Sequence, residues 1–253
     1  MSIQSKQDLE GMTKASEAVG ATLKKMREHA RPGMTTRELD EFGYALLQAY
    51  GANPAPKKEY GFPGWTCISV NDEAAHGIPT DKTILKSGDL VNIDVSAELN
   101  GYYGDNGGSF ILGEDTQRLT PLVEASRQIL YLAIRKIRGG VRVSEVGAMI
   151  ESEARKRGFT TIKNLVGHSI GLKLHDEPSY ELANYPDRLN RQRLKKNTVV
   201  ALETFISTKA RYVYPTRDGW TMKAKDGSFV AQHEHTLIVT DGYPVILTAN
   251  NGI

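Results

Sequence analysis

The chain has 253 residues, of which 40% are hydrophobic and 25% charged, and its formal net charge at pH 7 is +2. This composition is typical of a globular protein with a sizeable core, and the balanced charge argues against a dedicated nucleic-acid or membrane-surface protein. Cys67 is the single cysteine, which excludes an internal disulfide and a cysteine-based zinc site.

The N-terminal part of the chain predicts two helices, a loop and a strand. Its first ten residues are polar and contain no signal-peptide hydrophobic region, and no long apolar run follows, so we expect a cytoplasmic protein with no membrane partner. Apolar residues at helical spacing predict the first helix over residues 7–30. The second helix begins at a capping box of Thr35 and Glu38 and ends at Gly51. The prolines of residues 53–63 predict a loop, and the strand is expected at residues 66–70.

The next segment, residues 90–112, predicts a hairpin that bears two aspartates. Apolar and polar residues alternate along its first arm, and an Asn-Gly pair favours a two-residue type I′ turn. With this turn, Asp94 lies opposite Gly107 and Asp105 lies opposite Ser96. The two carboxylates then point from one face of the sheet as diagonal neighbours, and they would repel each other unless a cation lay between them.

The second half of the chain repeats the order of helices followed by strands. Thr120 is predicted to cap a third helix, with Pro121 at its first position, and a fourth helix ends at Gly158. Strands are then predicted at residues 199–207, 229–239 and 244–247. The repeated order, with no linker between the parts, indicates a single domain over residues 1–253 with two related halves, about 1–117 and 118–253.

Four acids and one histidine interrupt segments that otherwise look buried: Asp94, Asp105, Glu203, Glu234 and His168. An unpaired carboxylate inside such a segment costs several kcal/mol or shifts its pKa, so acids are rarely buried alone. Each residue taken singly is more often solvated, and the hairpin aspartates by themselves could mark the wet face of a sheet. As a set they form an oxygen-rich site suited to Mn, Fe, Co or Zn, and two such ions about 3.5–4 Å apart are the usual hydrolytic arrangement.

A series of short motifs runs along the chain in this order: Phe62-Pro63-Gly64, Cys67-Ile68-Ser69-Val70-Asn71, His76-Gly77-Ile78-Pro79, Gly88-Asp89-Leu90-Val91-Asn92-Ile93-Asp94-Val95, Asp105, Gly167-His168-Ser169-Ile170-Gly171 leading to His175, and Ala231-Gln232-His233-Glu234-His235-Thr236. In order and spacing these motifs resemble the type I methionine aminopeptidases, and the match covers nearly the whole chain. The resemblance implies an α/β (α+β) pita-bread fold, with two pseudo-symmetric halves and a curved, largely antiparallel sheet covered by helices. It also implies a metal-dependent aminopeptidase that removes the initiator methionine from nascent proteins.

The resemblance implies two divalent metal ions (Co, Mn, Fe or Zn) as cofactors and assigns a ligand role to each member of the set. Asp94 matches a chelator of one ion. Asp105 and Glu234 match residues that bridge both ions, and His168 and Glu203 match ligands of the other. The implied reaction is attack on the peptide by a metal-bridging hydroxide, with Glu203 as the proton shuttle.

The same resemblance implies catalytic roles for two further histidines and a pocket for the methionine side chain. His76 and His175 match a pair that contacts substrate and stabilises the tetrahedral intermediate. Phe62, Cys67 and Trp220 match residues that line the side-chain pocket, although core packing is an equally good interpretation of Trp220. The expected partners are the N-terminal peptides of nascent proteins and, as a candidate, the ribosome; no direct nucleic-acid partner is expected, and the protein is expected to be a monomer.

The chain departs from the family pattern at several positions, none of which is a ligand: Glu59, Asn106, Ser169, Asp176 and Thr204. Neighbours of ligands tune metal affinity and geometry, so these departures concern rate and preferred metal more than reaction type. Two alternatives stay open at this stage. One is an Xaa-Pro aminopeptidase or prolidase with the same fold and metals, and the other is a non-catalytic binding module with the same fold, for which the retention of all five ligands is unexpected.

Overall fold

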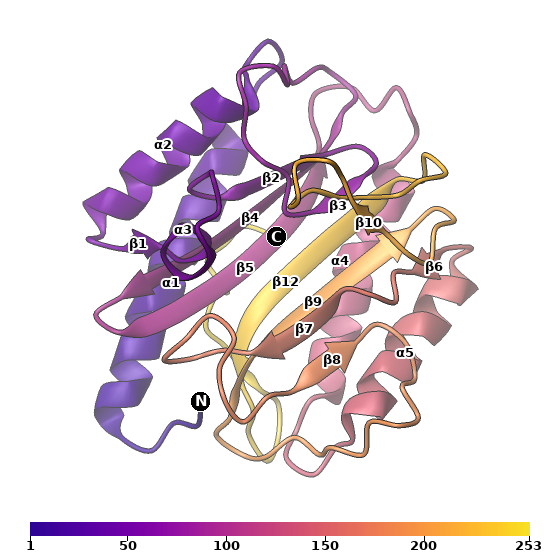
Figure 1. Cartoon of the computed structure of the whole chain (residues 1–253). Helices are drawn as coiled ribbons and strands as arrows, with labels where there is room; N and C mark the ends of the chain where they lie inside the picture. Colours follow the sequence, from indigo (N-terminus) through magenta and orange to yellow (C-terminus); the bar gives the residue numbers. More distant parts are fainter.

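Strands from both halves of the chain pair into one curved sheet in the computed structural model, which describes all 253 residues (Figure 1). The main path of this ten-stranded sheet is β1-β4-β5-β12-β9-β7-β8, with β2 added to β4, β6 to β9 and β13 to β12. Its strands are β1 (Asn53–Pro54), β2 (Cys67–Val70), β4 (Leu90–Leu99), β5 (Tyr102–Ile111), β6 (Thr160–Thr161), β7 (Val166–Ser169), β8 (Glu181–Ala183), β9 (Val199–Ser207), β12 (Val230–Ile238) and β13 (Val245–Ile246). All strand pairs are antiparallel.

Four long helices lie behind this sheet in the view of Figure 1, two against each half. They are α1 (Lys6–His29), α2 (Thr36–Ala49), α4 (Thr120–Lys136) and α5 (Val143–Lys156). One apolar cluster joins α1 and α2 to β2, β4 and β5, and another joins α4 and α5 to β9 and β12. The helices therefore bury one face of the sheet, which leaves its other face for polar side chains. No helix combines the length and the apolar character that crossing a membrane requires.

The predicted hairpin is confirmed residue by residue. Asn100 and Gly101 have φ values of 53° and 86°, as a type I′ turn requires. The register pairs Asp94 with Gly107 and Ser96 with Asp105. The capping box that begins α2 is also present, with the Thr35 hydroxyl and the Glu38 carboxylate bonded to each other's backbone N–H.

Two local predictions were wrong. Residues 53–63 do not form a simple loop, because β1 pairs with β4 and helix α3 (Ala55–Tyr60) follows it. A proline in the first turn and Gly61 in the left-handed conformation at the end suit a short helix. Thr120 is the first residue of α4 and not its cap; the Asp115 carboxylate accepts hydrogen bonds from the backbone N–H groups of Leu119 and Thr120.

The sequence analysis also missed several short strands. These are β6, β7 and β8 in the second half, and a small separate sheet of β3 (Glu73–Ala75), β10 (Tyr214–Pro215) and β11 (Met222–Lys223). Each has two to four residues, too few for a period-2 pattern to stand out. Strand β7 bears His168.

The backbone of helix α1 approaches the hairpin closely at Gly104, next to Asp105. A Cβ atom on Gly104 would lie 2.9 Å from the backbone carbonyl of Ala15, so the two elements pack without room for a side chain. We expect Gly104→Ala to lower the free energy of unfolding by about 1–3 kcal/mol, because backbone and not a flexible side chain must move. Urea unfolding followed by circular dichroism measures this change. Gly242→Ala is the matched control, since nothing lies within 4 Å of its added Cβ; equal midpoints for the two variants would contradict the packing argument.

Candidate metal centre and substrate cavity

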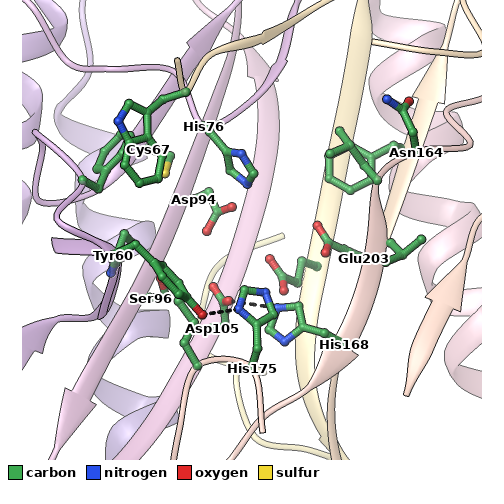
Figure 2. A pocket seen from close by; sticks show the side chains of 18 residues that line it. Tyr60, Cys67, His76, Asp94, Ser96, Asp105, Asn164, His168, His175 and Glu203 are labelled. Atoms are coloured by element: carbon green, nitrogen blue, oxygen red, sulfur yellow. Dashed lines mark hydrogen bonds and ion pairs between the residues drawn. The ribbon is translucent and has the colours of Figure 1, made fainter. Parts of the chain in front are cut away.

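The strand register brings two pairs of residues together on the open face of the sheet. Asp94 on β4 is paired with Gly107 on β5, and Glu203 on β9 is paired with Glu234 on β12. Because β5 and β12 are neighbours, the pairs meet at the middle of the sheet, where the two halves of the chain join. Asp105 adds a further carboxylate from the same face of β5. Figure 2 shows carboxylates from both sides pointing into one cavity.

His168 completes this group from β7. It is paired with Ala201, two residues before Glu203, so both side chains leave the same face of the sheet. Its Nε2 lies 3.5 Å from Asp105 Oδ2, and one ligand atom each of Asp105, His168 and Glu234 lies within 4.8 Å of the others. The Nδ1 atom of His168 lies 3.0 Å from the Ser169 carbonyl oxygen. A hydrogen bond to that carbonyl places the proton on Nδ1 and leaves Nε2 free to bind a metal.

Burial and mutual repulsion dominate the electrostatics of the site. Burial raises the pKa of Asp94 to about 6, and it raises the pKa values of Asp105, Glu203 and Glu234 well above their ordinary range. For the last three residues, repulsion by neighbouring carboxylates raises the pKa further. Burial lowers the pKa of His168 to about 3, which keeps the imidazole neutral and able to act as a ligand.

The protein supplies no cation to balance these acids. None of Asp94, Asp105, Glu203 and Glu234 forms an ion pair with a lysine or arginine, and the buried Oδ1 atom of Asp105 has no hydrogen-bond partner. Buried carboxylates without a partner are costly, whereas divalent ions such as Mn²⁺, Fe²⁺, Co²⁺ and Zn²⁺ accept carboxylate and imidazole ligands together. The residues present therefore fit a divalent metal centre.

A buried amide fixes the orientation of Glu234. The Gln232 side chain donates a hydrogen bond of 3.0 Å to Glu234 Oε2, and its carbonyl oxygen accepts one of 2.8 Å from Asn92. Gly107 makes room for this amide, because an added Cβ there would lie 2.3 Å from Gln232 Oε1. The chain Asn92–Gln232–Glu234 holds one carboxylate oxygen in place and leaves the other available as a ligand.

All ten residues predicted for the site line one cavity of about 280 Å³ beside the carboxylates: Phe62, Cys67, His76, Asp94, Asp105, His168, His175, Glu203, Trp220 and Glu234. Figure 2 shows His76 on one side of the carboxylates and His175 beside His168. His76 has a φ of 54°, an uncommon conformation for a residue with a side chain and one that recurs at functional sites. The rings of His168 and His175 are 4.2 Å apart between centroids.

The apolar part of the cavity includes the rings of Phe62 and Trp220 and the thiol of Cys67. Phe62 meets Trp220 edge to face, with 5.3 Å between ring centroids and an angle of 84°. Cys67 lies opposite Asp94 in the β2–β4 register, and burial raises the pKa of its thiol, so it stays protonated. These walls are shaped for an apolar, polarisable side chain.

The structure also places residues in the cavity wall that the sequence analysis did not single out: Pro56, Tyr60, Ser96, Asn164, Leu165, Val166, Leu174 and Phe205. Ser96 follows from the hairpin register, because it pairs with Asp105. The others come from α3, from β7 and the segment leading into it, from the loop beyond β7 and from β9. No local sequence pattern marks these residues as neighbours of the carboxylates.

The five positions that the sequence analysis expected to depart from the family pattern form hydrogen bonds with backbone groups or with residues outside the expected ligand set. The Ser169 hydroxyl donates to the Pro178 carbonyl oxygen and accepts from the Tyr180 N–H group. The Thr204 hydroxyl lies near that of Ser126, and the Asn106 amide donates a hydrogen bond to the Val95 carbonyl oxygen. The Asp176 carboxylate accepts a hydrogen bond from the Leu172 N–H group, and the Glu59 carboxylate accepts one from the Tyr103 hydroxyl. These contacts support the strands and loops that hold the ligands.

Residues 10–241 match the metallopeptidase family M24. The chain is 48% identical to methionine aminopeptidase 2 of Bacillus subtilis, an alignment that covers 98% of this chain and 99% of that protein. It superposes on the crystal structure of methionine aminopeptidase from Thermotoga maritima with a TM-score of 0.91 and 34% identity, covering 98% of this chain and 99% of that one. A prolidase from Pyrococcus furiosus shares the fold, with a TM-score of 0.76 and 21% identity over 97% of this chain and 65% of that chain.

The raised pKa of Asp94 gives a prediction for the metal-free protein. Asp94 is protonated in both the folded and unfolded states below its ordinary pKa of 3.8 and ionised in both above about pH 6. The folded state therefore loses stability as the pH rises between these values. Asp94→Asn removes this loss, so its stability relative to wild type should rise by roughly 1–3 kcal/mol between pH 4 and pH 7.

Urea unfolding of both proteins in chelator at several pH values measures this difference. Added Mn²⁺ should make the wild-type protein the more stable of the two, because the Asp94 carboxylate that binds the ion is absent from the variant. A difference that stays constant from pH 4 to pH 7 would show that Asp94 titrates in the folded protein as it does in the unfolded chain.

Proposed function

The chain belongs to metallopeptidase family M24, and on that premise we propose that it is a methionine aminopeptidase, which removes the N-terminal methionine of nascent proteins. The observation that supports this function most directly is the meeting of three buried carboxylates, the half-buried Asp94 and one imidazole beside an apolar, aromatic cavity. We also propose that residues 1–253 act as a single catalytic domain whose halves join between β5 and β12. A cytoplasmic location, a monomeric state and contact with the ribosome belong to the same proposal, since nascent chains are the substrate.

Five side chains would hold a pair of divalent ions. Asp94 would chelate one ion, Asp105 and Glu234 would bridge both, and His168 and Glu203 would bind the other. This assignment is supported by the closeness of Asp105, His168 and Glu234, by the neutral state of His168 and by the lack of any lysine or arginine paired with the acids. Bound divalent ions supply positive charge that lowers the pKa of water and polarises a carbonyl oxygen.

The surrounding side chains would handle the proton and the developing charge. Glu203 accepts a proton from the attacking water and passes it to the leaving amine, a role that suits a carboxylate whose pKa is raised by burial. His175 donates a hydrogen bond to the oxygen of the scissile carbonyl as negative charge develops there. His76, which lies across the carboxylates from His175 in Figure 2, would contact the substrate from that side.

The apolar wall would select the side chain of the first residue. Phe62, Cys67 and Trp220 form a pocket for an unbranched, polarisable thioether, and the free α-amine of the substrate would be held near the buried acids. A requirement for a free amine restricts cleavage to the first peptide bond. This selection distinguishes the proposed activity from that of prolidases, which share the fold.

We predict that the purified protein with Mn²⁺ or Co²⁺ releases methionine from Met-Ala-Ser and leaves Gly-Pro peptides intact. A chelator should abolish the release, and restored metal should recover it, because the carboxylates require the ions to hold and activate water. Chromatographic detection of free methionine measures the activity. Cleavage of Gly-Pro in preference to Met-Ala-Ser would favour the prolidase alternative, and no turnover with any divalent ion would favour a binding module.

We expect Glu203→Gln to lower kcat by a factor of about 10² or more, because the amide cannot accept the proton. The metal-free variant should remain folded, since the substitution removes a buried charge with nearly no change in volume. Steady-state kinetics and circular dichroism make the comparison. Glu145→Gln, an exposed change on α5, is the control and should retain wild-type turnover; comparable kcat values for the two variants would exclude Glu203 as the proton acceptor.

A further inference from the structure

Helix α3 is anchored beside the cavity by four consecutive side chains, each of which contacts a different segment. Their contacts are Lys57 with the ring of Trp65 before β2, Lys58 with Glu98 on β4, Glu59 with the hydroxyl of Tyr103 on β5, and Tyr60 with His175 beyond β7. A six-residue helix is not stable by itself in water, so these contacts determine where α3 lies. Figure 2 shows Tyr60 at the edge of the cavity with its hydroxyl directed at His175.

The two lysine contacts fix the helix in position. Lys57 Nζ lies 4.1 Å from the centroid of the Trp65 ring, and the other face of that ring stacks on Tyr44 of α2. Lys58 Nζ lies 2.9 Å from the buried Glu98 Oε2. A cation–π contact and a half-buried ion pair are each modest, but together they tie the helix to two different segments of the chain. The last helical residue, Tyr60, is therefore held at a defined distance from the carboxylates.

His175 needs such support, because no strand or helix holds it. It lies in the segment between β7 and β8, is exposed, and lies inside a turn in which the Asp176 carboxylate accepts a hydrogen bond from the Leu172 N–H group. The hydroxyl of Tyr60 lies 2.5 Å from His175 Nδ1. That hydroxyl has no other hydrogen-bond partner in the structure, so Nδ1 is the one protein atom to which it can donate. A neutral imidazole that accepts at Nδ1 has its own proton on Nε2.

We propose that Tyr60 is a positioning residue, which orients the ring of His175 and fixes its tautomer so that Nε2–H is the group offered to the substrate carbonyl. The assignment rests on the peptidase function proposed above. A donor at Nε2 is what stabilisation of a carbonyl oxygen requires, whereas the opposite tautomer would present a lone pair to that oxygen. Burial and the neighbouring carboxylates of Glu59 and Asp105 raise the pKa of Tyr60, which keeps the hydroxyl protonated as a donor.

The tautomer can be tested in the metal-free protein without any turnover. Long-range ¹H–¹⁵N correlation spectra of histidine rings distinguish a protonated from an unprotonated ring nitrogen, and the chain has only six histidines. The spectrum of His175→Gln identifies the resonances of His175 by their loss. We expect an unprotonated Nδ1 and a protonated Nε2 in the wild-type protein, and a mixture of both tautomers in Tyr60→Phe.

Kinetics on Met-Ala-Ser provide the second readout. Loss of an interaction that acts in the transition state lowers kcat and kcat/KM together, so we expect Tyr60→Phe to lower kcat about tenfold and to change KM less than about twofold. Tyr60→Leu should lower kcat no further, because the hydroxyl and not the ring is responsible. Tyr50→Phe is the matched control, since Tyr50 is an exposed tyrosine at the end of α2 with no side-chain hydrogen bond.

Two outcomes would overturn the proposal. One is an unchanged His175 tautomer in Tyr60→Phe, whatever its kcat, because a loss of rate would then come from packing. The other is a kcat for Tyr60→Phe equal to that of Tyr50→Phe. A wild-type protein that releases no methionine would instead contradict the peptidase function, and the spectra would still decide whether Tyr60 sets the tautomer.

Discussion

The repulsion between buried carboxylates is the constraint on which the rest of this structure depends. Four acids face one another on the open side of the sheet, without a lysine or arginine to balance them. Such a group is stable when its members bind protons or cations. The carboxylates therefore hold their protons more tightly, which is why the pKa values of Asp105, Glu203 and Glu234 are raised. The fold remains stable despite this repulsion, because the helices on the opposite face bury the sheet in two apolar clusters. Stability is thus supplied by one face of the sheet and chemistry by the other.

The pseudo-symmetric halves of the pita-bread fold explain how the acids come together. Each half contributes a pair of long antiparallel strands, β4 and β5 from the first and β9 and β12 from the second. Pairing of β5 with β12 joins the halves and puts the acids of both on one face. Because side chains alternate along a strand, a slip of one residue in any of these pairs would turn a carboxylate into the apolar core. The metal centre is therefore a consequence of strand register. The side chain of Gln232 occupies the space that the missing side chain of Gly107 leaves.

Much of this arrangement could be predicted from the sequence, where the determinants are local. The Asn-Gly turn fixes the register of its own hairpin, and the placement of Asp94 and Asp105 followed from it. The acids in β9 and β12 stood out against apolar neighbours. Helix α3 could not be predicted, because contacts with distant segments hold it in place. The contact between Tyr60 and His175 spans 115 residues and rests on no repeating pattern, so only the folded chain reveals it. The short strand that bears His168 was missed for lack of length, although the histidine itself was identified because it interrupts a segment that otherwise looks buried.

Anomalous diffraction from crystals soaked in Mn²⁺ would test the central claim most directly, because it locates bound ions without reference to activity. The account predicts two peaks in the cavity, within bonding distance of oxygen or nitrogen atoms of Asp94, Asp105, His168, Glu203 and Glu234, with Asp105 and Glu234 touching both. Saturating metal with no peak among these side chains, or peaks only at surface carboxylates elsewhere, would contradict it.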